Sequence, residues 1–176
     1  MFHRSKPIPT STAFLVSALM IYPAFSAISV DLDKQALQID FQFSLQPAED
    51  VSKYEALVEK LKKALSFTYS LLKLSPMVHS LDYQHKESIF IVSWCRDLLT
   101  LSEEEVDICH DIVYTFHEDQ RIELEYTFSD GEQFHHYEMI FDELFHQVQE
   151  ETQHPIQLRA YRDMGMIYVH RIQTDA

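Results

Sequence analysis

The sequence predicts an α+β domain, with a mainly antiparallel sheet built from helix–hairpin units and the helices packed on one face. Short segments in which apolar and polar residues alternate occur in adjacent pairs, as in antiparallel hairpins. A segment of helical periodicity precedes most pairs, and three strands keep a polar outer face, which predicts helices on one side and water on the other. Helix followed by hairpin occurs three times, at residues 12–44, 50–97 and 132–172, in a chain whose length suits one domain, 1–176.

The first expected helix lies in an uncharged stretch at residues 7–30. Its apolar run, 13–22, is about half of the ~20 residues that cross a membrane, so we expect no membrane span. Basic residues before the run and small residues after it also fit a signal peptide, 1–26, cleaved near Ser26 or Ala27. We prefer a retained first helix and a cytoplasmic protein. The alternative is a secreted structural domain that begins after the cleavage site.

The first hairpin is predicted at residues 27–32 and 37–45, joined by a polar turn at 33–35. In the second strand apolar residues take the odd positions and polar residues the even ones, which is the pattern of a half-buried strand. Residues 48–73 then show the clearest helical pattern in the chain. Their apolar stripe is wide, which favours packing on a sheet over a dimer interface.

A second hairpin is predicted at residues 77–84 and 88–97. The second strand reads SIFIVSWC and is nearly all apolar, so we expect a central strand buried on both faces. A helix follows from Ser102 to about Glu118, because Ser102 and Glu105 have the spacing of a capping box. The expected inner face of this helix holds Val106, Cys109, Val113 and Phe116.

The last part of the chain is predicted to form a strand, a helix and a third hairpin. The strand is expected at residues 121–128, where alternation returns, and the helix at about 132–151. The hairpin is expected at 155–162 and 166–172, with Gly165 in the turn because a glycine accepts a positive φ.

Glycine content excludes several enzyme classes. The chain holds two glycines, Gly131 and Gly165, so none of the motifs GxGxxG, GxxxxGK[ST] and GxSxG can be written with it. Phosphate-cradling loops and the strained nucleophile turn depend on such glycines. We therefore expect a non-enzymatic protein with no catalytic residues and no cofactor.

The negative charge is concentrated in one segment. The net charge is −14, and residues 98–154 hold sixteen acidic residues against one basic residue, Arg121. Such a segment repels nucleic acid and favours a basic protein partner, although a merely solubilising surface has the same composition. The sequence thus predicts an accessory or regulatory protein that binds a partner through this segment. A homodimer is a further alternative. The expected partner-binding residues are Glu103, Glu104, Asp107 and Asp111.

A divalent-metal protein is a further alternative. Asp107 and His110 are three residues apart, as are Glu143 and His146, and carboxylate–imidazole pairs at this spacing can share a metal ion. In a segment this rich in acids and histidines the spacing also arises by chance. The carboxylates should in addition raise the pKa of the histidines between them.

The two cysteines predict no zinc site, because Cys95 and Cys109 do not form a CxxC motif. In a cytoplasmic protein we expect both to be buried thiols that pack as small apolar residues. In a secreted protein a disulfide between them becomes possible.

Overall fold

A computed structural model describes residues 9–46, 50–119, 131–150 and 156–172, with the backbone alone at 119 and 131–137. The strand expected at 121–128 lies outside the described residues.

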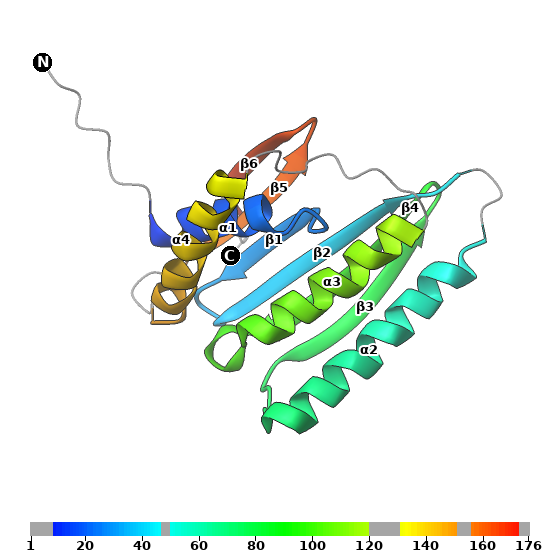
Figure 1. Ribbon diagram of the computed structural model, residues 1–176, viewed down its shortest axis with the longest axis horizontal. Helices are drawn as coiled ribbons and strands as arrows, with labels where there is room; N and C mark the ends of the chain where they lie inside the picture. The colour runs from blue at the N-terminus through cyan, green and yellow to red at the C-terminus, as the bar shows by residue number, and fades with distance from the viewer. Residues whose placement is uncertain (1–8, 47–49, 120–130, 151–155, 173–176) are drawn as a thin grey trace, which may run out of the picture.

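Six strands form one antiparallel sheet in the order β3-β4-β2-β1-β5-β6. Each sequential pair is a hairpin, and β1 and β2 lie at the centre between the other two hairpins (Figure 1). The α+β class and the three hairpins are therefore as predicted. The strands are β1 (Ala27–Asp31), β2 (Ala36–Ser44), β3 (His79–Lys86), β4 (Ile89–Asp97), β5 (Gln157–Asp163) and β6 (Met166–Arg171).

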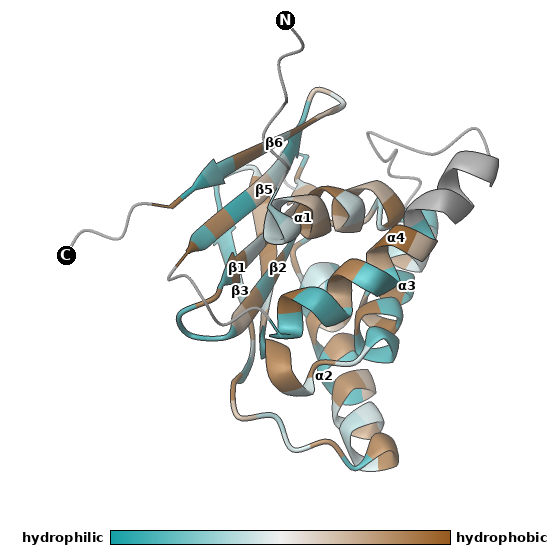
Figure 2. Cartoon of the chain, turned by 90° about the vertical axis from the view of Figure 1, so that its left-hand side faces the viewer, coloured by the Kyte–Doolittle hydropathy of each residue, from teal (hydrophilic) through white to brown (hydrophobic). Residues whose placement is uncertain are grey.

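The helices cover one face of this sheet. Figure 2 shows them together on one side of the strands, with the opposite side of the sheet open, as the alternation of residues predicts. None of the helices in the described residues is long and apolar enough to cross a membrane. The helices are α1 (Thr10–Ile21), α2 (Ser52–Leu72), α3 (Glu103–Asp119) and α4 (Gly131–Glu150), and a short 3₁₀ turn, η1 (Leu98–Thr100), links β4 to α3.

The strands bury one face under the helices. In β2 the odd-numbered apolar residues from Leu37 to Phe43 are all buried. In β4 the inward residues are buried, but Ile91, Ser93 and Cys95 on the other face are half-buried. The expectation that β4 is buried on both faces is therefore wrong. Its outer face is apolar at Ile91, yet no described helix covers that side of the sheet.

Helix α1 is an integral part of the core. It carries no charged side chain and lies between the sheet and α4, and Phe14, Leu15, Ala18 and Leu19 are buried. The ring of Phe14 stacks on that of Phe141 in α4, with centroids 5.4 Å apart. A fully buried side chain of this size contributes about 1.5–3 kcal/mol. The predicted first helix is confirmed as an element of the fold.

The beginning of α3 is held by a buried ion pair. Ser102 and Glu105 form the predicted capping box: the amide of Ser102 donates to Glu105 Oε2 at 2.9 Å, and the amide of Glu105 donates to Ser102 Oγ at 3.3 Å. The same carboxylate accepts from Arg96 of β4, which is 1% exposed, at 2.9 and 3.2 Å. Glu105 therefore fixes α3 on the sheet and is absent from the acidic surface.

The turn of the last hairpin contains two residues whose backbone lies in the left-handed region of φ and ψ. Met164 has φ 48° and Gly165 has φ 74°, the combination of a type I′ turn, whose twist matches the flanking strands. The position predicted for Gly165 is confirmed. Met164 adopts the same region while being 87% exposed.

Candidate functional site

A cavity of about 570 Å³ lies between α3 and α4 and ends at the last turn of α1. Most of the side chains that line it are acidic, so we call it the acidic groove. Its lining residues are Ile21, Tyr22, Glu103, Asp107, His110, Asp111, Glu138, Met139 and Asp142.

The groove carboxylates form two rows at helical spacing. On α3, Glu103, Asp107 and Asp111 follow one another at four-residue intervals, and on α4, Glu138 and Asp142 do the same. Residues four apart lie on one face of a helix. The α3 row therefore runs along the groove for about 12 Å, at 1.5 Å per residue.

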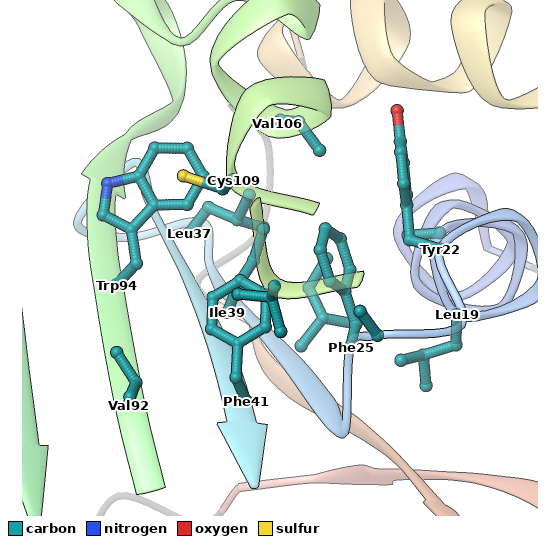
Figure 3. Packing of buried hydrophobic residues seen from close by; sticks show 14 of the residues in the cluster. Leu19, Tyr22, Phe25, Leu37, Ile39, Phe41, Val92, Trp94, Val106 and Cys109 are labelled. Carbon is teal, nitrogen blue, oxygen red and sulfur yellow. The ribbon is translucent and has the colours of Figure 1, made fainter. Parts of the chain in front are cut away.

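The floor of the groove is built by the end of α1. Tyr22 is 8% exposed and belongs to the core, yet its hydroxyl donates a 2.7 Å hydrogen bond to Asp107 Oδ1. In Figure 3 the ring stands at the edge of the apolar cluster, with its oxygen directed away from Phe25. Ile21 and Met139 supply apolar surface beside it. The groove thus combines carboxylate walls with an apolar floor.

Like charges face one another across the groove. The pKa of Glu103 is raised, first by partial burial and then by Asp142 and Asp107, while the nearby imidazole of His146 acts in the opposite direction. The imidazole of His146 and the carboxylate of Glu103 are 4.0 Å apart, from Nε2 to Oε1. Among the described lining residues there is no lysine or arginine. Glu103 is therefore repelled by Asp107 and Asp142, and the described lining supplies no lysine or arginine to offset them.

His110 lies in an aromatic setting. Its ring centroid is 5.2 Å from that of Tyr22 and 5.5 Å from that of Tyr114. Burial lowers its pKa, although its Nδ1 is 3.2 Å from Asp111 Oδ1. Burial likewise lowers the pKa of His117 to about 4. The expectation of raised pKa values is wrong for these two histidines. At His110 desolvation outweighs the carboxylates of Asp111 and Asp107, and at His117 desolvation acts together with the charge of His110.

Three of the four expected partner-binding residues line the groove. Glu103, Asp107 and Asp111 meet in its α3 wall, whereas Glu104 is exposed beside it and is not part of the lining. A residue one step along a helix is turned by about 100°, so Glu104 points in another direction. Sequence reasoning did not find Tyr22.

The expected metal ligands do not converge. Asp107 and His110 line the groove, but Asp107 accepts from Tyr22. Glu143 accepts a hydrogen bond from Gln147 at 3.1 Å, and the side chain of His146 is 73% exposed. Within the described parts of the chain, no group of three or more potential ligands could hold a metal ion.

The two cysteines lie on opposite sides of the sheet. Cys109 faces the core from α3 beside Trp94 (Figure 3), whereas Cys95 is half-buried on the outer face of β4. Both are free thiols, and burial raises the pKa of each. The disulfide considered for a secreted protein is absent from the structure, and the prediction of a fully buried Cys95 is wrong.

Comparison with known proteins found no matching family, no similar curated protein and no similar solved structure. The fold and the groove define the class of the molecule: an α+β protein whose antiparallel sheet carries its helices on one face, with an acidic groove between two of them.

Proposed function

We propose that the protein is a non-enzymatic accessory or regulatory protein that binds a basic segment of a protein partner in the acidic groove. The observation that carries this proposal is the pair of facing carboxylate rows. Lysine or arginine side chains placed between Glu103, Asp107 and Asp142 would replace repulsion by attraction.

The shape of the lining favours a protein segment over a bare ion. Lysine and arginine carry a methylene stem as well as a charge, and the stem packs on apolar surface while the head meets the carboxylates. Ile21, Tyr22 and Met139 offer such a surface. A divalent ion would need several oxygen ligands converging on one point, a geometry that the described carboxylates lack.

The direct test is a titration of the full chain with a synthetic helical peptide that bears lysines at positions i, i+4 and i+8, followed by calorimetry. This spacing matches the α3 row of Glu103, Asp107 and Asp111. We expect saturable binding at low salt that weakens strongly as ionic strength rises, because exposed charges are screened within about 10 Å at 0.1 M salt.

A matched pair of triple variants separates the groove from the general acidity of the chain. Glu103→Gln/Asp107→Asn/Asp142→Asn neutralises the groove, and Glu104→Gln/Glu118→Gln/Glu143→Gln removes the same charge from exposed positions outside its lining. We expect the first variant to weaken binding about tenfold or more, and the second about twofold. Equal losses in the two variants would refute a specific groove.

A further inference from the structure

A second cavity, of about 450 Å³, opens at one end of the sheet and differs in charge from the acidic groove. We call it the sheet notch. It lies within the size range of about 300–1,000 Å³ that is typical of small-molecule sites. Its lining residues are Pro23, Ala24, Phe25, Ser26, Ala27, Asp40, Gln42, Phe43, Ser44, Ile91, His117, Arg159, Tyr161 and Arg162.

The notch arises because β1 is shorter than its neighbours. β2 pairs with β4 as far as Ser44, but it pairs with β1 only as far as Asp40. Where β1 has ended, the amide of Gln42 donates to Ser26 Oγ at 2.7 Å. A gap therefore remains between the end of β2 and the end of β5, with side chains from both faces of the sheet around it.

The outer side of the notch presents a charged fork. Arg159 donates to Asp40 Oδ2 at 2.7 Å and to Ser29 Oγ at 3.1 Å, and its side chain is still 33% exposed. Guanidinium carries five N–H donors. Asp40 is 5% exposed and also accepts from Ser93 at 2.8 Å, and Arg159 is the cation that offsets its charge. The lining holds this one carboxylate together with the guanidinium groups of Arg159 and Arg162.

The inner side of the notch holds a neutral imidazole. His117 is 5% exposed and stacks on Phe43, with ring centroids 5.0 Å apart. Within the part of the chain that the structure describes, its buried Nδ1 has no hydrogen-bond partner. An unpaired buried nitrogen costs about 1–3 kcal/mol, so such groups are rare in folded proteins. A ligand that pairs with this nitrogen would remove that cost.

We propose that the sheet notch binds a small carboxylate whose body is flat and apolar. The guanidinium fork of Arg159 would take the carboxylate, and Phe25, Phe43 and Ile91 would contact the body. Arg159 keeps guanidinium donors that Asp40 and Ser29 do not occupy, and its described surroundings in the lining hold one carboxylate against five in the acidic groove, so an anion meets less repulsion there. This inference is independent of the function proposed for the groove.

Three probes of one shape and different charge test the assignment: benzoate, neutral benzamide and cationic benzamidine. Each is titrated at constant ionic strength into the ¹⁵N-labelled full chain, and amide shifts are followed by NMR. We expect benzoate to shift the amides of Ser26, Gln42 and Tyr161 saturably, with a dissociation constant in the millimolar range. Benzamide should bind there at least fivefold more weakly. Equal affinities, or benzoate shifts confined to other residues, would overturn the proposal.

Two sets of variants test the cavity and the guanidinium group of Arg159 separately. Ser44 is exposed and lines the notch, so Ser44→Phe should fill it and abolish benzoate binding, whereas Ser80→Phe on the same face of the sheet should leave binding unchanged. The double variant Arg159→Gln/Asp40→Asn removes the fork without leaving a buried carboxylate unpaired. It should bring the dissociation constants of benzoate and benzamide to within twofold of each other. Retained fivefold discrimination in that variant would refute the role of Arg159.

Discussion

The hydroxyl of Tyr22 donates a 2.7 Å hydrogen bond to Asp107 Oδ1, joining the end of α1 to the second turn of α3 across 85 residues of sequence. The tyrosine ring packs in the core against Phe25, with centroids 4.8 Å apart, while the carboxylate belongs to the acidic groove. One side chain thus couples the stability of the fold to the position of a groove carboxylate.

We expect Tyr22→Phe to lower the free energy of unfolding by about 1–2 kcal/mol near neutral pH, because the variant loses a hydrogen bond to a charged group and keeps the ring. Burial and the bond to Asp107 raise the pKa of Tyr22 above its ordinary 10.0. The unfolded chain therefore loses this proton first, and the wild-type protein should lose stability above about pH 10. Urea unfolding at pH 7 and pH 10.5 measures both effects, and a pH dependence unchanged by the substitution would contradict the assignment.

The ion pair between Arg96 and Glu105 supports a second prediction. The two side chains are 1% and 0% exposed, so Glu105→Gln leaves the buried guanidinium with Asp97 as its one remaining carboxylate partner among the described residues. We expect a cost of about 3–5 kcal/mol. Glu104→Gln, one residue earlier on the exposed face, should cost less than about 0.5 kcal/mol. Chemical denaturation of both variants gives the comparison, and similar losses would mean that the pair contributes little.

Local patterns predicted the helices and hairpins because alternation and helical periodicity are properties of neighbouring residues. The same patterns wrongly predicted a buried outer face for β4, which is half-buried. An apolar residue such as Ile91 does not reveal whether helices cover one face of the sheet or both. The α3 wall was partly predictable, because Glu103, Asp107 and Asp111 share one helical face. The facing Asp142 and the floor at Tyr22 were not predictable, because they depend on how α1 and α4 pack.

The sheet notch could not be predicted from the sequence. It depends on a difference of a few residues between the lengths of β1 and β2, and strand ends are the least certain part of a local pattern. The alternation in β2 continues through Gln42 and Ser44, which look like ordinary outward residues. Only the pairing register shows that β1 has already ended beside Gln42 and Ser44.

The position of α1 supports a third prediction, which bears on cleavage near Ser26 or Ala27. A chain beginning at Ala27 lacks Phe14, Leu19 and Phe25, all of which are buried. We expect residues 27–176 alone to show no cooperative unfolding by circular dichroism. Within the full chain, Phe14→Ala should cost about 3–5 kcal/mol. Phe67→Ala should be nearly neutral, because Phe67 is 68% exposed. A stably folded 27–176 fragment would contradict this account of the core.

His117 should make the protein less stable in mild acid. Burial lowers its pKa from 6.5 to about 4, so the folded protein keeps the imidazole neutral in a range where the unfolded chain binds a proton. Stability should therefore fall as pH drops from about 6.5 to about 4 and level off below, by at most about 3 kcal/mol for this group. Urea midpoints across this range should drop less steeply for His117→Phe, which keeps a ring against Phe43, than for the wild type. His170→Phe changes an exposed position on β6 and should leave the pH dependence of the urea midpoint unchanged. If His117→Phe also left that dependence unchanged, the imidazole of His117 would not be neutral inside the fold, and the prediction would be wrong.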